Sequence, residues 1–347
     1  MKYKRLSGTG LTVSNLCIGT MTFGDQVDEK TGAEIINYAL DNGINFIDTA
    51  DVYTGGKSEI IVGKGLKGRR EEAVLASKIR YNITGRMNDE GLHRGHMISG
   101  VEACLKRLDT DYLDILYLHA PDYNTPIEET MEAATQLVKS GKVRYIGVSN
   151  YAAWQIVDLI RTGEKINGVT PVVTQDCYNL ITRSIDRELV PCIEEHDIGL
   201  VVYSPLASGL LTEKQLSGKP AEGSRMSINK QYNDRFWKPT NLEAVQSLAA
   251  IAADAGLNIT ELAINWCNSR SCVNSILVGM SSLDQLKQNI AWLHDEPLAK
   301  DVMNKCDEVW ARIDDQSFKE PLNKSPSFSA ERENRRLPLG SSDSVGK

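Results

Sequence analysis

The sequence predicts an α/β protein with the (β/α)8 TIM barrel fold. From about residue 15 onward, short apolar segments alternate eight times with segments whose apolar residues recur at helical spacing. Each short segment is almost continuously apolar, which is typical of parallel strands that helices cover on both faces. Eight such units in series fit a closed barrel better than an open, doubly wound sheet, and the 347 residues are enough for one barrel of more than about 250 residues.

Each of the eight predicted units is a strand followed by a helix. The predicted strands lie at 16–23, 45–50, 73–79, 112–119, 144–150, 172–180, 199–207 and 274–280. The predicted helical segments lie at 30–43, 58–66, 97–109, 126–141, 152–163, 186–197, 241–269 and 282–293. In the fourth helix, Pro126, Glu128 and Glu129 occupy the first turn, where a proline and negative charges stabilise a helix N-terminus.

One glycine motif suggests a different fold, and its context rejects it. Residues 63–68, GKGLKG, match the G-x-G-x-x-G pattern of dinucleotide-binding sheets. That pattern requires a strand before it and a helix after it. Here a predicted helix precedes the motif and a strand follows it. We therefore interpret the motif as a helix end and a turn.

Two regions lie outside the eight units. Residues 212–240 are polar and follow the seventh strand, so we expect a long loop at the catalytic rim, because loops of this length are usually functional. Residues 321–347 are rich in serine, proline and charge, with few apolar residues to anchor them. The sequence therefore predicts a barrel domain at 1–320 and a polar, disordered tail at 321–347.

Composition argues against several classes of function. The net charge of -7 and the isoelectric point near 5.4 disfavour nucleic acid or a membrane surface as the main partner. No segment approaches the roughly 18 apolar residues of a membrane span, and the N-terminus lacks the apolar core of a signal peptide, so we expect a cytoplasmic monomer or homo-oligomer. The seven cysteines form no C-x-x-C pair, and His93 and His96 lack a neighbouring ligand cluster, so we expect reduced thiols and no metal.

Four polar residues at the ends of predicted strands form a candidate catalytic site. Asp48 lies near the end of the second strand with Tyr53 five residues later, Lys78 near the end of the third, and His119 at the end of the fourth. The ends of successive strands converge in a parallel barrel, so these side chains can meet in one pocket. Each residue taken singly is more often a rim or core residue, but all four types needed for one proton transfer fall on three successive strands.

Together these four residues can donate a proton to a carbonyl oxygen. A free tyrosine has a pKa of about 10 and is a weak acid at neutral pH. A nearby ammonium group favours the phenolate, and a carboxylate keeps that ammonium charged and in place. The histidine can orient the carbonyl oxygen or relay the proton. We therefore predict reduction of a carbonyl by a hydride that another group supplies.

Other strand ends carry residues suited to a nicotinamide cofactor. Ser149, Asn150 and Gln175 can hold a carboxamide, and the face of Tyr203 can stack on the ring. The segment Gly279–Ser282 opens the last predicted helix, where backbone N–H groups favour a phosphate. Further candidates for the adenine and phosphate groups are Gln285, Gln288, Asn289, Lys214 and Arg225. Taken singly, each polar candidate is more often an ordinary rim residue, and Lys214 or Arg225 is more often an exposed, solvated cation.

Several of these segments resemble the aldo-keto reductase superfamily. The resemblance rests mainly on Asp48–Glu59, Gly147–Asn150, Tyr203–Leu206 and Gly279–Asn289 and extends from about residue 1 to residue 315. The chain looks most like the bacterial and fungal reductases related to the β-subunits of potassium channels. This resemblance implies NADP(H) as the cofactor and a small carbonyl compound as the substrate.

The resemblance also implies a role for each candidate residue. Tyr53 would be the general acid, Lys78 its activating neighbour, Asp48 the partner of that lysine and His119 the group that orients the carbonyl. Ser149, Asn150 and Gln175 would hold the carboxamide, and Tyr203 would stack on the nicotinamide. The remaining cofactor residues would be Ser204, Leu206 and Gly209 at the pyrophosphate, Lys214 and Arg225 near the phosphates, and Gly279, Ser281, Ser282, Gln285, Gln288 and Asn289 at the adenosine end.

One departure from the family and two rival functions bear on this interpretation. Many relatives place a Lys or Arg in the loop after the last strand, where this chain has residues 280–284, MSSLD, so the positive charge must come from Lys214 or Arg225. One rival is a cofactor-binding regulatory subunit of a membrane channel, although such subunits typically carry Asn where this chain has His119. The other is a phosphate-binding isomerase, against which the four-residue acid cluster argues.

Overall fold

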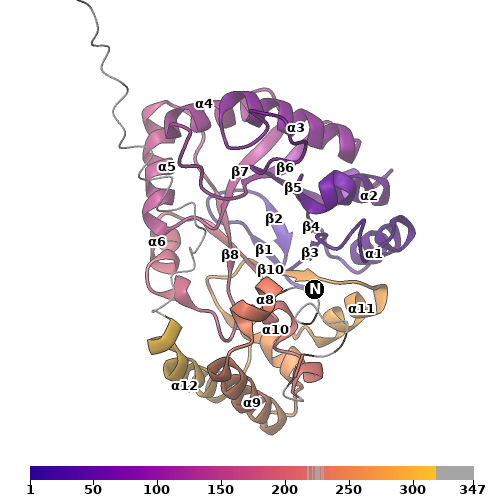
Figure 1. Ribbon diagram of the computed structural model, residues 1–347, viewed down its shortest axis with the longest axis vertical. Coiled ribbons are helices and arrows are strands. Elements are labelled where there is room, and N and C mark those ends of the chain that lie inside the picture. The colour runs from indigo at the N-terminus through magenta and orange to yellow at the C-terminus, as the bar shows by residue number, and fades with distance from the viewer. Residues whose placement is uncertain (217–218, 221, 223–226, 228–229, 318–347) are drawn as a thin grey trace, which may run out of the picture.

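The computed structural model describes residues 1–216, 219–220, 222, 227 and 230–317. Eight parallel strands close into a barrel with the order β10-β3-β4-β5-β6-β7-β8-β9. Figure 1 shows the helices arranged around these strands. The predicted (β/α)8 TIM barrel is confirmed. The predicted boundary at residue 320 and the tail at 321–347 lie outside the described residues.

The strands and helices follow the predicted alternation. The barrel strands are β3 (Leu16–Gly19), β4 (Phe46–Asp48), β5 (Val74–Ile79), β6 (Leu113–Leu118), β7 (Val143–Ser149), β8 (Val173–Cys177), β9 (Gly199–Tyr203) and β10 (Ser275–Gly279). The α-helices are α1 (Glu29–Asp41), α2 (Lys57–Gly65), α3 (Arg94–Leu108), α4 (Ile127–Lys139), α5 (Ala153–Lys165), α6 (Leu189–Glu195), α8 (Lys230–Phe236), α9 (Pro239–Asp254), α10 (Ile259–Ser269), α11 (Leu283–Trp292) and α12 (Lys300–Ser317).

The core has two layers because alternate residues of each strand face opposite sides. The outer layer lies between the strands and the helices and includes Ile18, Ile47 and Leu75. The inner layer fills the barrel and includes Phe46 and Val74. The continuous apolar character of the predicted strands thus reflects burial on both faces.

An antiparallel hairpin that the sequence did not reveal precedes the barrel. It pairs β1 (Tyr3–Arg5) with β2 (Thr12–Ser14). Leu6 and Val13 belong to the apolar cluster that fills the barrel interior, so the hairpin contributes to that core. Each strand has only three residues, too few for an alternating pattern to be recognised.

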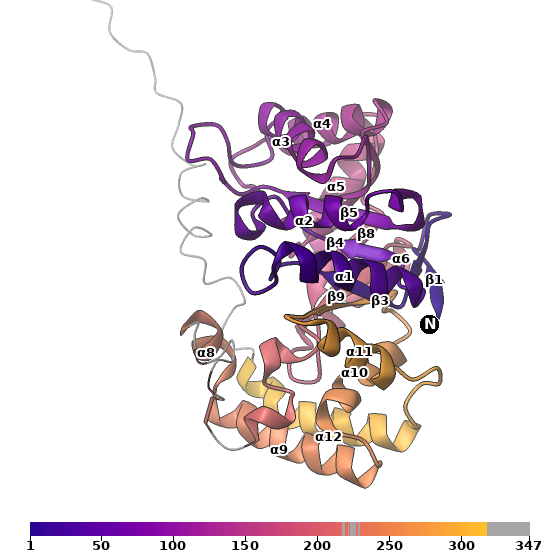
Figure 2. The same ribbon diagram turned by 90° about the vertical axis from the view of Figure 1, so that its right-hand side faces the viewer.

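The segment 212–240 is not the uninterrupted loop that the sequence predicted. It contains a 3-10 turn, η5 (Glu213–Gln215), and the helix α8, and the helix α9 begins at Pro239. Helix α12 lies outside the eight predicted units and packs against α9. Figure 2 shows α9 and α12 together on the same side of the barrel. The polar sequence of 212–240 concealed α8 because it lacks a clear apolar stripe.

The glycine motif at 63–68 lies at a helix end, as predicted. Helix α2 ends at Gly65, so the motif begins inside a helix, and the next regular strand after it is β5. A Cβ atom at Gly63 would lie 2.3 Å from the carbonyl oxygen of Leu108. The glycine therefore permits close packing of α2 against the end of α3.

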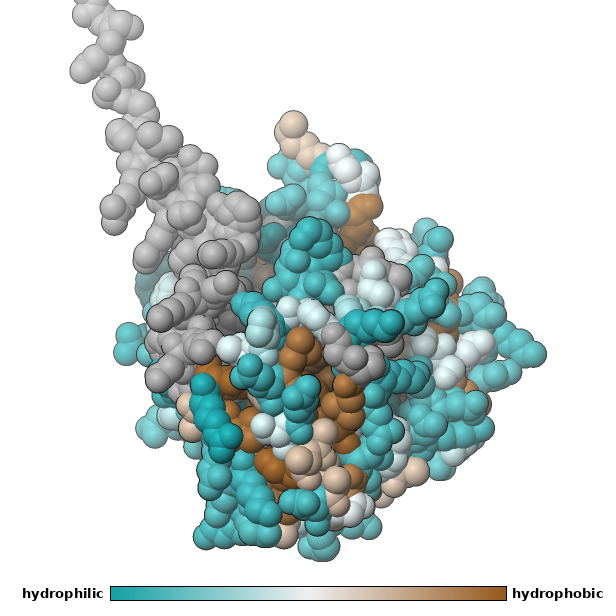
Figure 3. All heavy atoms as spheres, turned by 60° about the horizontal axis from the view of Figure 1, so that its bottom comes forward, coloured by the Kyte–Doolittle hydropathy of each residue, from teal (hydrophilic) through white to brown (hydrophobic). Residues whose placement is uncertain are grey.

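The surface and the thiols agree with the composition. The seven cysteines are free, and five of them are buried. The face seen in Figure 3 is largely hydrophilic, and the largest group of apolar residues on it lies in the lower centre.

In the part of the chain that the structure describes, no single helix is long and apolar enough to cross a membrane. The helices α9 and α10 reach that length together, but the chain bends by 87° between them.

Candidate active site

Asp48 and Lys78 form a buried ion pair inside the barrel, at the C-terminal ends of the strands β4 and β5. Asp48 follows Phe46 by two residues and Lys78 follows Ala76 by two, so both side chains face inward, as those apolar residues do. The Lys78 ammonium donates to the Asp48 carboxylate. It also donates to the carbonyl oxygen of Thr49 at 3.0 Å and lies 3.3 Å from the Tyr53 hydroxyl. The predicted catalytic residues of these two strands therefore meet.

Burial and charge act on this pair in opposite directions. Burial by itself would lower the pKa of the Lys78 ammonium, but the Asp48 carboxylate and, less strongly, Tyr53 hold that pKa above its ordinary value. Burial raises the pKa of Asp48, and donation from Lys78 and from the Gln175 amide opposes the rise. The outcome is a fixed positive charge beside the Tyr53 hydroxyl.

Tyr53 begins a tight 3-10 turn, η1 (Tyr53–Gly56), between β4 and α2. Thr54, Gly55 and Gly56 have positive φ angles of 49°, 65° and 88°. The Thr54 hydroxyl donates to the carbonyl oxygen of Phe23 at 2.7 Å, which fastens the turn to the loop after β3. This local geometry directs the Tyr53 ring toward the barrel axis and its hydroxyl toward Lys78.

His119 completes the predicted group of four. Its ring lies edge-on to the ring of Tyr53, with centroids 5.9 Å apart, and edge-on to Tyr81 at 5.1 Å. Burial, followed by the positive charges of Lys78 and Arg80, holds the pKa of His119 well below its ordinary value. The imidazole is therefore neutral at physiological pH. Its Nδ1 atom is buried and has no hydrogen-bond partner among the described residues.

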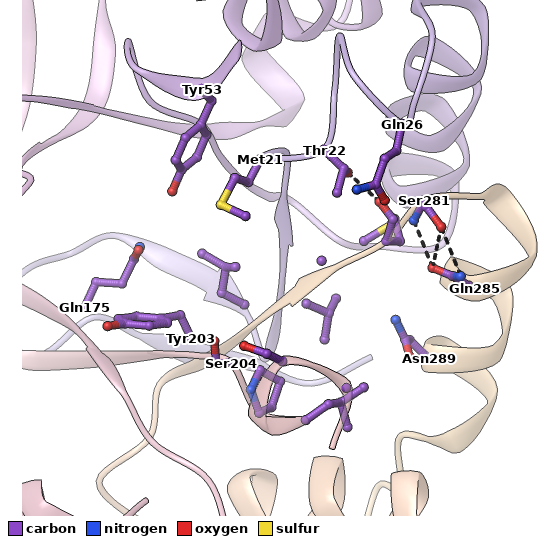
Figure 4. Close-up of a pocket in the computed structure, with 18 of the residues that line it drawn as sticks. Met21, Thr22, Gln26, Tyr53, Gln175, Tyr203, Ser204, Ser281, Gln285 and Asn289 are labelled. Carbon is purple, nitrogen blue, oxygen red and sulfur yellow. Dashed lines mark hydrogen bonds between the residues drawn. The ribbon is translucent and has the colours of Figure 1, made fainter. Parts of the chain in front are cut away.

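A pocket of about 440 Å³ opens beside these groups. Figure 4 shows Tyr53 at one end and Gln285 and Asn289, from α11, at the other. The predicted residues that line it are Tyr53, His119, Ser149, Asn150, Gln175, Tyr203, Ser204, Leu206, Gly209, Gly279, Ser281, Gln285 and Asn289. Residues from six strand ends and from α11 thus meet around a single cavity.

The three residues predicted for the carboxamide and Tyr203, predicted to stack on the ring, form a linked chain of hydrogen bonds. The Tyr203 hydroxyl donates to Asn150 Oδ1 at 2.7 Å, and Asn150 Nδ2 donates to the Ser149 hydroxyl at 3.0 Å. Ser149 in turn donates to the carbonyl oxygen of Gln175 at 2.9 Å. The Gln175 amide donates to Asp48 Oδ2 at 2.8 Å, so Gln175 also holds the catalytic carboxylate, a contact that the sequence did not predict.

The loop after β9 has an unusual backbone. Ser204, Ala207, Ser208 and Gly209 all have positive φ angles, between 47° and 97°. Turns of this kind can form a concave site for an anion. In this loop the N–H groups of Ala207 and Gly209 donate to the carbonyl oxygens of Ser204 and Leu206. The Ser208 hydroxyl is buried in the pocket wall without a partner among the described residues. These features suit the pyrophosphate expected beside Ser204, Leu206 and Gly209.

The turn from β10 to α11 satisfies its own polar groups. Ser282 caps α11 by accepting from the backbone N–H of Gln285. The Gln285 side chain folds back onto Ser281, with Oε1 2.9 Å from its backbone N and Nε2 3.1 Å from its hydroxyl. A ligand that binds at the N-terminus of α11 must therefore displace the Gln285 side chain from Ser281 or accept a hydrogen bond from its amide.

Three of the predicted cofactor residues that the structure describes do not line the pocket. Ser282 serves as the helix cap, Gln288 is exposed on α11, and Lys214 is exposed on η5. Arg225 lies outside the described residues. The structure therefore does not identify a cation for a 2′-phosphate.

Sequence reasoning also missed several residues of the pocket wall. They come from the loop after β3 and from the strand β10: Met21, Thr22, Gln26, Leu277 and Val278. The general rule that strand ends line a barrel pocket would have found the first group, because Met21 and Thr22 follow β3 directly. The apolar residues of β10 carry no sequence signal that separates pocket wall from core.

The residues present fit a nicotinamide dinucleotide. The pocket has amide and hydroxyl groups near the catalytic end, an anion-favouring loop in its wall and polar groups of α11 at the far end. The buried and unpartnered Ser208 hydroxyl, among the described residues, offers a further hydrogen bond to a bound group.

A closed barrel with a buried lysine–aspartate pair beside a tyrosine defines a class of oxidoreductase, and the comparisons give the family. The family model described as the aldo/keto reductase family matches residues 15–311. This chain therefore belongs to the aldo/keto reductase family.

Three relatives illustrate where the chain lies in that family. It is 38% identical over 317 residues to a probable voltage-gated potassium channel subunit beta of Arabidopsis thaliana, which covers 89% of this chain and 96% of that protein. It is 36% identical over the same shares to a protein with the same description from Oryza sativa subsp. japonica. It is 33% identical over 309 residues to aflatoxin B1 aldehyde reductase member 2 of Rattus norvegicus, which covers 84% of this chain and 83% of that protein.

Proposed function

We propose that this protein reduces small aldehydes or ketones to alcohols with NADPH and that Tyr53 donates the proton. The observation that carries this proposal is the buried Lys78 ammonium, which lies 3.3 Å from the Tyr53 hydroxyl and is held by Asp48. A phenol beside a fixed positive charge can release its proton to a developing alkoxide. Membership of a family of reductases supports the same chemistry.

Each residue has a distinct part in the proposed reaction. When bound, the dihydronicotinamide supplies a hydride to the carbonyl carbon. The C=O π electrons then take the proton of the Tyr53 hydroxyl, so the carbonyl is reduced to an alcohol and Tyr53 is left as phenolate. The Lys78 ammonium stabilises that phenolate, and the neutral His119 ring, beside Tyr53, orients the carbonyl oxygen.

Turnover of a generic aldehyde tests this function. We expect the purified protein to oxidise NADPH in the presence of 4-nitrobenzaldehyde, with one alcohol formed for each NADPH consumed. Heat-inactivated protein and protein without the aldehyde are the controls. If NADPH binds and no alcohol forms across a panel of aldehydes and ketones, the proposal is wrong.

The alternative is a regulatory subunit that binds NADP(H) and acts on a membrane channel. The names of the two plant relatives favour it. The aldehyde reductase of rat, and a histidine at position 119 where channel subunits typically carry asparagine, favour an enzyme. Slow or absent turnover with tight cofactor binding would support the channel subunit. Under either function, the cytoplasmic location and the monomeric or homo-oligomeric state are also proposals.

We predict that the enzyme prefers NADPH to NADH. The N-terminus of α11 favours an anion, and one charge-assisted contact to the 2′-phosphate contributes roughly 1.5–3 kcal/mol, or about 10- to 100-fold. The measurement is the ratio of kcat/KM for the two cofactors at several salt concentrations. Equal values would refute the preference, and a ratio that is independent of salt would exclude a cation.

Two variants identify the cation if the preference holds. Lys214 and Arg225 were predicted from the sequence, and Lys214 is exposed and does not line the pocket. Replacing the residue that contacts the 2′-phosphate with Ala should lower the preference of the enzyme for NADPH and leave its kinetics with NADH unchanged. Replacing the other residue should change neither. Lys165→Ala, at the far end of α5, is the matched control.

A further inference from the structure

A second group of buried charged residues lies behind the catalytic four. Asp51 follows β4, Glu59 lies in the first turn of α2, and Arg107 lies in the last turn of α3. Asp51 and Glu59 are buried, with 1% and 0% of their surface exposed, and the Arg107 side chain is 20% exposed. None of the three lines the pocket, so the mechanism above does not use them.

Glu59 joins the strand of Lys78 to helix α3. Its Oε1 accepts from the Ser77 hydroxyl at 2.6 Å, and its Oε2 accepts from Arg107 Nε at 2.6 Å. Ser77 precedes Lys78 and points to the outer side of the barrel, because neighbouring strand residues face opposite sides. The Glu59–Arg107 ion pair therefore supports the strand that carries the catalytic lysine.

Arg107 also packs against the turn that carries Tyr53. A Cβ atom at Gly56, the last residue of η1, would lie 2.7 Å from Arg107 Cδ and 2.8 Å from its Nε. The arginine stem thus fills the space left by the missing side chain of Gly56, whose φ is 88°. A shift of Arg107 would leave the Tyr53 turn without this support.

Asp51 is the member of the group without a counter-ion of its own. Its backbone N–H donates to the carbonyl oxygen of Lys78 at 3.1 Å, which joins the Tyr53 segment to β5. Its Oδ1 atom is buried and has no hydrogen-bond partner among the described residues. The charged and titratable groups that act on its carboxyl are Glu59 of α2, Arg107 and Cys104 of α3, and Lys78 of β5.

The charges of the group do not balance if both carboxyls are ionised. The single guanidinium donates to Glu59, and the Lys78 ammonium donates to Asp48. An ionised Asp51 would then be a buried carboxylate without a paired cation, which is unfavourable in a protein interior. A neutral carboxyl removes this cost.

We propose that Asp51, Glu59 and Arg107 position the Tyr53 turn, and that Asp51 does so as a neutral carboxyl. This inference rests on the proposed function, in which Tyr53 is the acid. Burial and then the charge of Glu59 raise the pKa of Asp51 to about 7, which agrees with a neutral group below that pH. When Asp51 ionises, it repels Glu59, the ion pair with Arg107 is disturbed, and Tyr53 loses its fixed place beside Lys78.

The pH dependence of Asp51→Asn tests the neutral carboxyl, because Asn has the same shape and cannot ionise. In the wild type, kcat should fall severalfold as pH rises through about 7, the pKa of Asp51. Asp51→Asn should match the wild type at pH 6 to within about twofold and lack this fall. The KM for NADPH should be alike in both. The same fall in the variant would overturn the role of Asp51.

Arg107 variants test the positioning of the turn. Arg107→Ala removes both the ion pair and the contact with Gly56, so kcat should fall by about 10-fold or more, since misplacement of a catalytic group by about 1 Å can cost 10²-fold. Arg107→Lys keeps the stem and the charge and should recover much of the rate. Arg94 lies on the same helix as Arg107, and Arg94→Ala, which breaks its exposed ion pair with Glu132 of α4, is the control and should leave kcat unchanged. Full activity of a folded Arg107→Ala would overturn the proposal.

Two measurements test Asp51 without enzyme activity. Infrared difference spectra at pH 6 should show a protonated carboxyl band that Asp51→Asn lacks. The folded-state pKa of Asp51, about 7, lies above its ordinary 3.8, so its stabilising contribution is present in acid and is lost as pH rises from about 4 to about 7. As pH rises over this range, the urea midpoint of Asp51→Asn should therefore increase relative to the urea midpoint of the wild type. If the wild type shows both the infrared band and this change in the urea midpoint but has no reductase activity, the proposed function is wrong and the neutral Asp51 still stands. If neither the band nor the change is seen, Asp51 is not neutral.

Discussion

Replacing Tyr53 with Phe should lower the rate of carbonyl reduction by at least about 10²-fold, the loss typical of a missing general acid. The substitution removes the hydroxyl that lies 3.3 Å from Lys78 and keeps the ring that packs edge-on to His119. NADPH should bind as before, because the ring remains in the pocket wall. The measurement is the single-turnover rate with 4-nitrobenzaldehyde, together with a fluorescence titration of NADPH.

Tyr81→Phe is the matched control for this experiment. Tyr81 also lies edge-on to His119, at 5.1 Å, but its hydroxyl has no part in the proposed proton transfer. Its rate should stay within about threefold of the wild type. If Tyr53→Phe retains activity within the same range, Tyr53 is not the acid.

Replacing Lys78 with Met should have the second large effect, on turnover and on stability together. Without the ammonium, the phenolate loses its stabilising charge, so turnover should fall and the basic limb of the pH–rate profile should move to higher pH. The Asp48 carboxylate would also remain buried without its partner, and breaking a buried ion pair in this way costs roughly 3–5 kcal/mol. Urea unfolding measures that loss of stability.

A double variant separates the two consequences. Lys78→Met combined with Asp48→Asn removes both charges, so stability should largely recover while turnover stays low. Recovery of turnover in the double variant would mean that Lys78 acts on folding alone. An unchanged pH profile in an active Lys78→Met enzyme would give Lys78 a different role.

The inner faces of the strands explain why the meeting of Asp48 and Lys78 could be predicted. Apolar residues fix which positions of β4 and β5 face the barrel interior, and Asp48 and Lys78 lie two residues beyond Phe46 and Ala76 on that same face. A polar residue in such a position must have a partner, and strand ends converge in a barrel. The fold therefore follows from the series of apolar strands, and the meeting of Asp48 with Lys78 follows from their positions at the ends of two of those strands.

Contacts between distant segments could not be predicted in the same way. The hydrogen bond from Gln175 to Asp48 spans 127 residues, and the ion pair of Arg107 with Glu59 spans 48. No periodic pattern records such pairs. The contact of Gln285 with Ser281 depends on a side-chain rotamer, which a sequence does not reveal.

The cation for the 2′-phosphate is the weakest part of the prediction for a physical reason. Lys214 was chosen because it is a basic residue in a long polar segment, and such a segment has no apolar pattern that fixes the direction of its side chains. The structure places Lys214 on the surface, away from the pocket wall. The placement of the strand-end residues around the pocket could be predicted because the core constrains those strands.

Transfer of deuterium tests the central claim most directly. NADPH carrying deuterium at both positions of the nicotinamide C4 is incubated with the protein and 4-nitrobenzaldehyde, and the alcohol is analysed by mass spectrometry and NMR. We predict one deuterium at the carbinol carbon with wild-type protein, and at least about 10²-fold slower formation of that product with Tyr53→Phe. An alcohol without deuterium, or equal rates of labelled product with both proteins, would contradict the proposed reduction by hydride and a Tyr53 proton.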